Sequence, residues 1–303
     1  MVSDHRYDLN EVTLDRIFEE QIVPILFANV EPAEHPLLIL VGAQPGAGKT
    51  RAGRLAAREA TSDVVRIIGD DLRQFHPAFE TLLGHNPAAM PDATAQALSA
   101  WVERSIDYAI SHRVSALVEG TFRNPDVPLR TARVFRRAGY AVHVVVVAVR
   151  PHISRASIAA RYVHDAANNG DARFTSVVAH DVSFGAIEGT LEKLGKNTAP
   201  IGMVSFFDRT GLVERVKGAP STGIPRLVLF YRRALSRPLL MDAVNTWRED
   251  VTVALRYFEE SGVEAEELDA LVASLVQDLH DNELTWIPAY RTPTDTIRGH
   301  IGR

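Results

Sequence analysis

The segment LLILVGAQPGAGKT, residues 37–50, decides the fold. Its apolar run at 37–41 has the length of a buried parallel strand, and it leads through a glycine-rich turn into Lys49, Thr50 and a helical pattern. Such a turn can hold phosphate, because glycines let backbone N–H groups turn inward at the positive N-terminal end of the next helix. Residues 37–50 therefore predict a nucleoside triphosphate site of the P-loop type.

The side chains of this loop have separate expected roles. Lys49 is expected to contact the β and γ phosphates, and Thr50 to give its hydroxyl to Mg²⁺. Ala43 departs from the strict pattern, which has glycine six positions before the lysine. The predicted ATP-binding residues are Gln44, Gly46, Ala47, Gly48, Lys49 and Thr50.

Composition narrows the class of protein. The chain has 303 residues, of which 46% are hydrophobic and 23% charged, as in a globular protein with a large core. A net charge of −5 argues against a nucleic-acid-coating surface, and the absence of cysteine excludes disulfides and thiol nucleophiles. The polar N-terminal segment does not read as a signal peptide, and no apolar run is long enough to span a bilayer. We therefore expect a cytoplasmic protein with neither nucleic acid nor membrane as a partner.

Strand and helix patterns alternate along most of the chain. The expected strands are 37–41, 64–68, 115–118, 141–149 and 202–207, and the expected helices are 14–27, 50–60, 93–112, 129–138, 153–167 and 177–194. This alternation implies right-handed β-α-β units and a mostly parallel sheet with helices on both faces. The predicted class is α/β, a P-loop kinase three-layer sandwich with a C-terminal helical extension.

Three segments are expected along the chain. Residues 1–217 form the kinase domain with its N-terminal helix, and the turn-rich sequence GAPSTGIP marks a linker at 218–225. Residues 226–303 form a helical extension, with amphipathic stretches at 237–261 and 264–281, which packs on the core or on a partner.

Acidic residues follow two of the predicted strands. Ligands of parallel sheets bind beyond the carboxyl ends of the strands, where the phosphate loop, Asp70 and Glu119 converge. Asp70 is interpreted as a general base, with helix capping as the alternative, and capping is assigned to Asp71. Glu119 can bind Mg²⁺ through water, accept hydrogen bonds from a sugar-like substrate, or be a solvated strand end. Thr121 and Arg123 extend the same loop.

Basic residues gather after the fourth strand. An arginine fork suits the oxygens of a transferring phosphoryl group, although each of these positions also fits a helix surface. Arg161 and Arg173 flank a segment of lid-like composition. The arginines in this region are Arg150, Arg155, Arg161 and Arg173. A structural hydrogen bond is the preferred interpretation of His180 and Asp181.

Several segments, in this order, resemble the zeta toxins of bacterial toxin–antitoxin systems, over residues 10–215. The segments 69–79 and 118–128 are more specific than the phosphate loop, which many kinases share. The matching segments are AQPGAGKT (43–50), GDDLRQFHPAF (69–79), VEGTFRNPDVP (118–128), AVRPHISRASIAARY (148–162) and DARFTSVVAHD (171–181).

The resemblance implies an ATP- and Mg²⁺-dependent kinase that phosphorylates a sugar hydroxyl of UDP-N-acetylglucosamine or a related nucleotide sugar, with an antitoxin protein as a partner. It implies that Lys49 contacts phosphate, Thr50 binds Mg²⁺ and Asp70 is the general base. It also implies that Arg161 and Arg173 contact the γ phosphate. By the same resemblance the sugar nucleotide is held by Asp70, Glu103, Glu119, Thr121 and Arg123.

Three alternatives stay open. The same fold can phosphorylate another small molecule, such as an antibiotic or a nucleotide. A different class of function is a nucleotide-gated binding protein, in which ATP controls a partner contact made by residues 226–303. These residues can also block the ATP site in cis, as an antitoxin helix does in the family.

Overall fold

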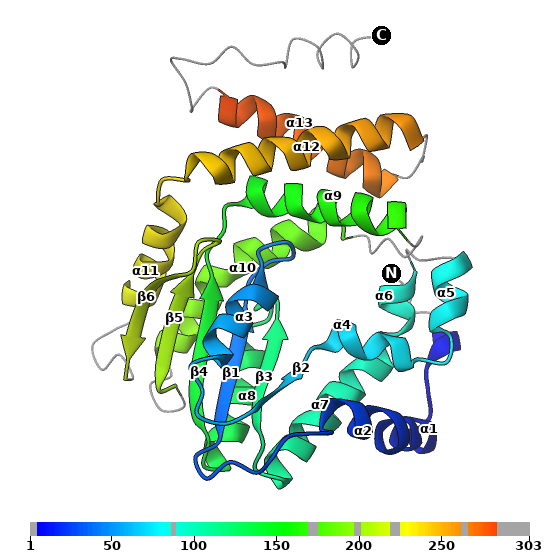
Figure 1. Cartoon of the computed structure of the whole chain (residues 1–303), viewed down its shortest axis with the longest axis vertical. Coiled ribbons are helices and arrows are strands. Elements are labelled where there is room, and N and C mark those ends of the chain that lie inside the picture. Colours follow the sequence, from blue (N-terminus) through cyan, green and yellow to red (C-terminus); the bar gives the residue numbers. More distant parts are fainter. Residues whose placement is uncertain are drawn as a thin grey trace.

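The computed structural model describes residues 5–85, 89–168, 175–196, 201–218, 225–261 and 266–283 (Figure 1). Within these residues a six-stranded sheet has the order β2-β3-β1-β4-β5-β6. All neighbouring strands are parallel except β5 and β6, which are antiparallel. The strands are β1 Leu37–Gly42, β2 Val64–Ile67, β3 Ser115–Gly120, β4 Ala141–Val147, β5 Met203–Phe207 and β6 Leu212–Lys217.

Helices connect and cover these strands. Short 3₁₀ segments are η1 His5–Tyr7 and η3 Arg73–Phe75, and a π-helical segment, η2 Phe18–Ile22, joins α1 to α2. The helices are α1 Glu11–Ile17, α2 Val23–Leu26, α3 Lys49–Ala57, α4 Gly69–Leu72, α5 Phe79–His85, α6 Met90–Ala93, α7 Ala95–Ser111, α8 Asp126–Arg137, α9 Pro151–Asn168, α10 Val177–Lys196, α11 Pro225–Ser236, α12 Met241–Ser261 and α13 Glu266–Glu283.

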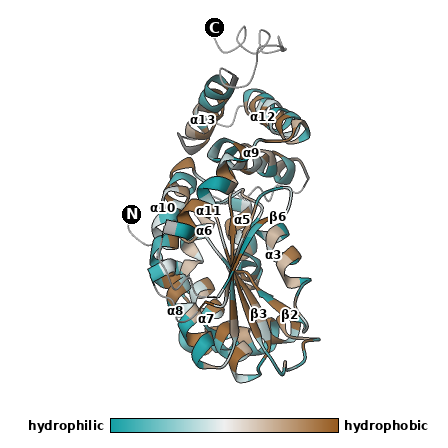
Figure 2. Cartoon of the chain, turned by 90° about the vertical axis from the view of Figure 1, so that its left-hand side faces the viewer, coloured by the Kyte–Doolittle hydropathy of each residue, from teal (hydrophilic) through white to brown (hydrophobic). Residues whose placement is uncertain are grey.

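The sheet separates two apolar clusters. Along β1, Leu38 and Leu40 join the cluster shared with α8, α10 and α11, whereas Ile39 and Val41 join the cluster shared with α3, α9 and α12. Successive side chains of a strand point to opposite faces, so a strand that is buried on both faces must be apolar throughout. Figure 2 shows the sheet edge-on, with α3 on one side and α7 and α8 on the other. The predicted three-layer α/β fold is confirmed.

The C-terminal helices pack on this core. Leu227 and Tyr231 of α11 are buried in the first cluster, and Val251 of α12 and Leu275 of α13 are buried in the second. Figure 1 shows α9, α12 and α13 stacked beyond the end of the sheet at which the phosphate loop lies. Among the described residues, no helix combines the length and the apolarity needed to cross a membrane.

Several elements were not predicted. The short helices α5 and α6 and the strand β6 were missed, and α11 begins at Pro225, which the prediction placed in the linker. Proline fits the first turn of a helix, where its missing N–H costs no hydrogen bond. Residues 219–224 of the predicted linker lie outside the described residues, and the division at 218–225 stays a prediction.

The capping role expected for Asp71 is wrong. The residue that precedes α4 is Ile68, which makes no side-chain capping bond, and Asp70 and Asp71 both lie in the first helical turn. Carboxylates at these positions still favour the helix, because its N-terminal end carries partial positive charge.

Candidate active site

The loop between β1 and α3 has the conformation that its glycines predict. Gly46 and Gly48 have φ angles of 73° and 92°, in the left-handed region that favours glycine. A Cβ on Gly46 would lie 2.2 Å from the carbonyl oxygen of Ser154, whereas a Cβ on Gly48 would meet no atom within 4 Å. The loop is therefore pressed against α9 at Gly46 and has open space at Gly48, where a phosphate can approach the backbone.

Lys49 lies at the start of α3 with its side chain turned back on the loop. Its Nζ donates hydrogen bonds to the carbonyl oxygens of Ala43 and Gln44, at 3.2 and 3.1 Å. Burial lowers the pKa of Lys49 to about 8, against the opposing effect of the Glu119 and Asp70 carboxylates. The hydrogen-bond acceptors of this amine are neutral carbonyl oxygens. A phosphate group would place negative charge beside it, so the site fits a nucleotide.

Thr50 and Glu119 face one another beside this amine. Thr50 Oγ1 lies 3.5 Å from Glu119 Oε2, and Glu119 Oε1 is buried without a hydrogen-bond partner in the described part of the chain. Burial raises the pKa of Glu119, and the positive charges of Lys49 and Arg66 oppose this effect. The pair offers the oxygen ligands that Mg²⁺ prefers. No group of three His, Cys, Asp or Glu suited to a metal occurs in the described residues, so phosphate oxygens and water would complete the coordination.

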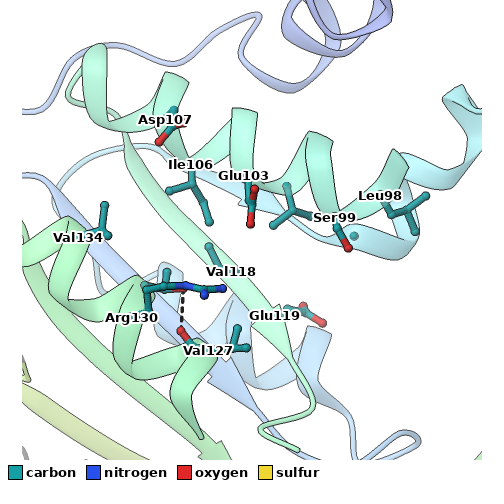
Figure 3. A pocket seen from close by; sticks show the side chains of 13 residues that line it. Leu98, Ser99, Glu103, Ile106, Asp107, Val118, Glu119, Val127, Arg130 and Val134 are labelled. Atoms are coloured by element: carbon teal, nitrogen blue, oxygen red, sulfur yellow. Dashed lines mark hydrogen bonds between the residues drawn. The ribbon is translucent and has the colours of Figure 1, made fainter. Parts of the chain in front are cut away.

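A cavity of about 600 Å³ opens next to Glu119, between α7, β3 and α8. Figure 3 shows the side chains of Glu103 from α7 and Arg130 from α8 in this cavity, above and below the apolar Val118 in this view. Gly69, the residue before Asp70, also lines it. A cavity with apolar walls and a few charged groups is typical of a site for a small polar molecule.

Asp70 directly follows Gly69, which lines this cavity, but is not itself among the lining residues. Its side chain is 66% exposed, and Arg73 Nη2 donates to its Oδ1 at 2.9 Å. Thr121 is half-buried and Arg123 is exposed, on the loop after β3, and neither is among the residues that line the cavity. The structure thus brings Glu103 and Glu119 to one cavity, and Asp70 is the residue after Gly69 at that cavity.

The predicted arginines separate into two groups. Arg161 of α9 is exposed, donates to Thr175 Oγ1 at 3.3 Å, and contributes to the lowered pKa of Lys49, so its charge acts on the phosphate loop. Arg150 and Arg155 instead contact the C-terminal helices. Arg173 lies outside the described residues.

Sequence reasoning missed three charged residues of the site, Arg209, Arg130 and Asp107. Arg209, in the turn between β5 and β6, donates from Nη2 to the carbonyl oxygen of Gly46 at 3.0 Å. No sequence motif marks it, because the hairpin itself was not predicted. Arg130 lines the cavity on the α8 face that also carries Thr131 and Val134. No motif in the sequence indicates that its side chain reaches the cavity.

Comparisons with known proteins identify the family of this chain. The family model described as zeta toxin matches residues 25–215. The chain belongs to the zeta toxin family. Toxin PezT of Streptococcus pneumoniae serotype 4 is 30% identical over 184 residues, which are 60% of this chain and 70% of that toxin. Toxin zeta of Streptococcus pyogenes is 28% identical over 202 residues, 65% of this chain and 70% of that toxin.

Solved structures share the fold. A chain of the PezAT chromosomal toxin–antitoxin system of Streptococcus pneumoniae matches with a TM-score of 0.70 at 22% identity, over 82% of this zeta toxin family member and 99% of that chain. The AvrRxo1-ORF1:-ORF2 structure with ATP matches with a TM-score of 0.51 at 14% identity, over 88% of this chain and 87% of that one. At these identities the matches establish the architecture alone.

Proposed function

We propose that this chain is a kinase of the zeta-toxin type, which uses ATP and Mg²⁺ to phosphorylate a sugar hydroxyl of UDP-N-acetylglucosamine or a related nucleotide sugar. The observation that carries the proposal is the position of Glu119. This residue contacts Thr50 of the phosphate loop and also lines the 600 Å³ cavity. A phosphoryl donor on the loop and an acceptor in the cavity would therefore meet at one carboxylate.

The loop residues would hold the donor. The open space at Gly48 admits phosphate to the backbone, and the Lys49 amine can leave its carbonyl partners for phosphate oxygens. Thr50 and Glu119 would hold Mg²⁺, which neutralises phosphate charge when it is bound. The charge of Arg161 acts on the same loop, and we assign Arg173 to the same task.

The cavity residues would hold the acceptor. Asp70 takes the proton of the attacking hydroxyl, because it is an exposed carboxylate that directly follows Gly69 of the cavity, and Arg73 donates a hydrogen bond to it. Glu103 can accept hydrogen bonds from sugar hydroxyls across the cavity from Arg130, and Arg130 can contact an anionic group of the nucleotide. Thr121 and Arg123 extend this surface along the loop after β3.

We further propose that an antitoxin protein controls this activity in the cytoplasm. The support is family membership together with the structural match to a chain of a toxin–antitoxin system.

The decisive experiment is mass spectrometry of ATP, Mg²⁺ and UDP-N-acetylglucosamine incubated with the wild-type chain or with Lys49→Ala. We expect a sugar nucleotide heavier by one phosphate with the wild type and no such product with the variant. Hydrolysis of ATP without a phosphorylated sugar nucleotide would contradict the acceptor and favour a nucleotide-gated binding protein. A phosphorylated product from an antibiotic or nucleotide alone would reassign the acceptor class.

A further inference from the structure

A buried chain of hydrogen bonds starts at the phosphate loop. The Nε2 of Gln44 donates to the Ser154 hydroxyl at 3.1 Å and to the carbonyl oxygen of Val149 at 2.7 Å. Ser154 Oγ lies 2.7 Å from His180 Nε2, and His180 Nδ1 lies 2.6 Å from Asp181 Oδ1. Gln44, Ser154 and His180 are fully buried. The serine is thus closed to any substrate, and the Ser–His–Asp order does not form a nucleophile.

The direction of each hydrogen bond follows from the chemistry of its partners. The Asp181 carboxylate can only accept, so His180 carries its proton on Nδ1. Burial lowers the pKa of His180, which leaves Nε2 free of a proton and able to accept from the Ser154 hydroxyl. The oxygen of that hydroxyl in turn accepts from Gln44. Each donor in the series has an acceptor, and the Ser154 hydroxyl also lies within hydrogen-bond distance of the carbonyl oxygens of Arg150 and Pro151, at 3.3 and 3.1 Å.

The series continues into the C-terminal helices. Arg155 Nη2 donates to Asp181 Oδ1 at 3.1 Å, and Arg155 Nη1 donates to both carboxylate oxygens of Asp278 at 2.6 and 2.9 Å. Asp278 belongs to α13 and is buried. We call this series the relay; its members are Gln44, Ser154, His180, Asp181, Arg155 and Asp278.

The backbone of α9 is held between the loop and the same C-terminal helices. On the loop side, the carbonyl oxygen of Ser154 closes the space beside Gly46. On the other side, Trp247 Nε1 donates to the carbonyl oxygen of His152 at 3.2 Å, and Arg150 donates to the carbonyl oxygens of Leu235 and Arg237. A shift of α9 would therefore displace the phosphate loop directly.

We propose that Asp278 is a positioning residue, which acts through the relay to hold the phosphate loop in its nucleotide-binding conformation. The inference rests on the proposed function in one respect, that this loop binds nucleotide. It gives the C-terminal helices a supporting role, the opposite of a block on the ATP site in cis.

A second ion pair of the C-terminal helices provides a matched control. Arg232 of α11 contacts Glu188 of α10 at two points, 2.9 and 2.6 Å, and neither residue belongs to the relay. Arg232→Gln removes a two-point contact between the C-terminal helices and the core, as Asp278→Asn does, but it leaves the path to Gln44 intact.

The test is calorimetric titration of the full chain with ADP and Mg²⁺. We expect Asp278→Asn to raise Kd about five- to tenfold and Arg232→Gln to change it less than about twofold. In a Ser154→Ala background, Asp278→Asn should add little further loss, because the relay is already broken. An unchanged Kd in Asp278→Asn, or an equal loss in both backgrounds, would overturn the proposal.

Two additional measurements keep the test decisive. Arg155→Lys keeps a positive charge but cannot contact both carboxylates at once, so it should reproduce the loss if Asp278→Asn does not fold. Hydrogen exchange of residues 44–48 in the free chain should be faster in Asp278→Asn than in the wild type and unchanged in Arg232→Gln. If the wild type binds no ADP, the proposed function fails. The inference about Asp278 is then decided by hydrogen exchange alone, and equal exchange rates of residues 44–48 in Asp278→Asn and the wild type would refute it.

Discussion

The side-chain nitrogen of Lys49 lies 3.2 Å from the carbonyl oxygen of Ala43, within the loop whose phosphate it is expected to bind. The free loop thus satisfies its own lysine through backbone oxygens. Because carbonyl groups bring no negative charge, they do not offset the cost of burying an ammonium ion, and the pKa of Lys49 falls to about 8. The negative phosphate of a bound nucleotide would raise this pKa again.

Nucleotide binding is therefore expected to take up a proton near Lys49. Phosphate raises the pKa of a neighbouring amine, so at pH 8.5 the bound chain holds more protons than the free chain, and affinity falls as the pH rises through 8. The binding enthalpy of ADP should differ between two buffers of different ionisation enthalpy. Lys49→Arg, which stays charged, should abolish the difference. Equal enthalpies for the wild type would refute the expectation.

Asp70→Asn tests the assignment of the general base. The substitution should lower kcat about 100- to 10,000-fold, the range that general base catalysis supplies, and leave the affinity for ADP and Mg²⁺ unchanged. Because the Asp70 side chain is 66% exposed, folding should be unaffected. Asp71→Asn in the same helical turn is the control and should retain near wild-type kcat. Comparable rates for the two variants would remove Asp70 from the mechanism.

Glu119→Gln is expected to separate stability from activity. The raised pKa of Glu119 means that the folded chain prefers the protonated side chain, so the wild type loses stability as the pH rises above the ordinary value of 4.5. The neutral amide removes this loss and should raise the free energy of unfolding at pH 7 by about 1 kcal/mol. The effect of Mg²⁺ on ADP affinity should decrease. Denaturant titrations at pH 4.5 and 7 check the first result, and a stability gain that is equal at both pH values would argue against it.

Gly46→Ala should both destabilise the chain and weaken nucleotide binding. The added Cβ would lie 2.2 Å from a backbone oxygen, at a φ of 73°, for an expected loss of about 2–4 kcal/mol. Gly185→Ala is the counterpart, since this glycine lies within α10 with no atom within 4 Å of its added Cβ, and should gain about 1 kcal/mol. Urea titrations of both variants measure the difference; similar stabilities would show that the loop tolerates a side chain there.

The strands around the phosphate loop were predictable because most of their residues are apolar and are buried against helices on both faces of the sheet. β6, with the sequence LVERVK, was not, because its charges fit an edge strand only when its partners are known: Arg215 contacts Ser205 of β5 and Glu59 after α3. The antiparallel pairing of β6 with β5 depends on this tertiary context.

The site residues that directly follow a strand could be predicted from the sequence. Contacts between side chains that are far apart in the sequence could not. Arg155 and Arg161 looked equivalent in the sequence, but six residues along a helix turn the side chain by about 240°, toward a different neighbour. Arg155 therefore meets Asp278, a contact that joins residues far apart in the chain. No local pattern contains this information, and the same holds for the link between Ser154 and His180.

The position of α13 along the chain has a consequence for protein synthesis. This helix buries Leu271 and Leu275 beside the phosphate-loop side of the core, supplies Asp278, and is the most C-terminal of the described elements. The N-terminal part of a nascent chain leaves the ribosome first, so the loop at residues 43–50 emerges long before the helix that supports it. If Asp278 holds the loop as proposed, a nascent chain lacks a finished nucleotide site until translation has passed α13.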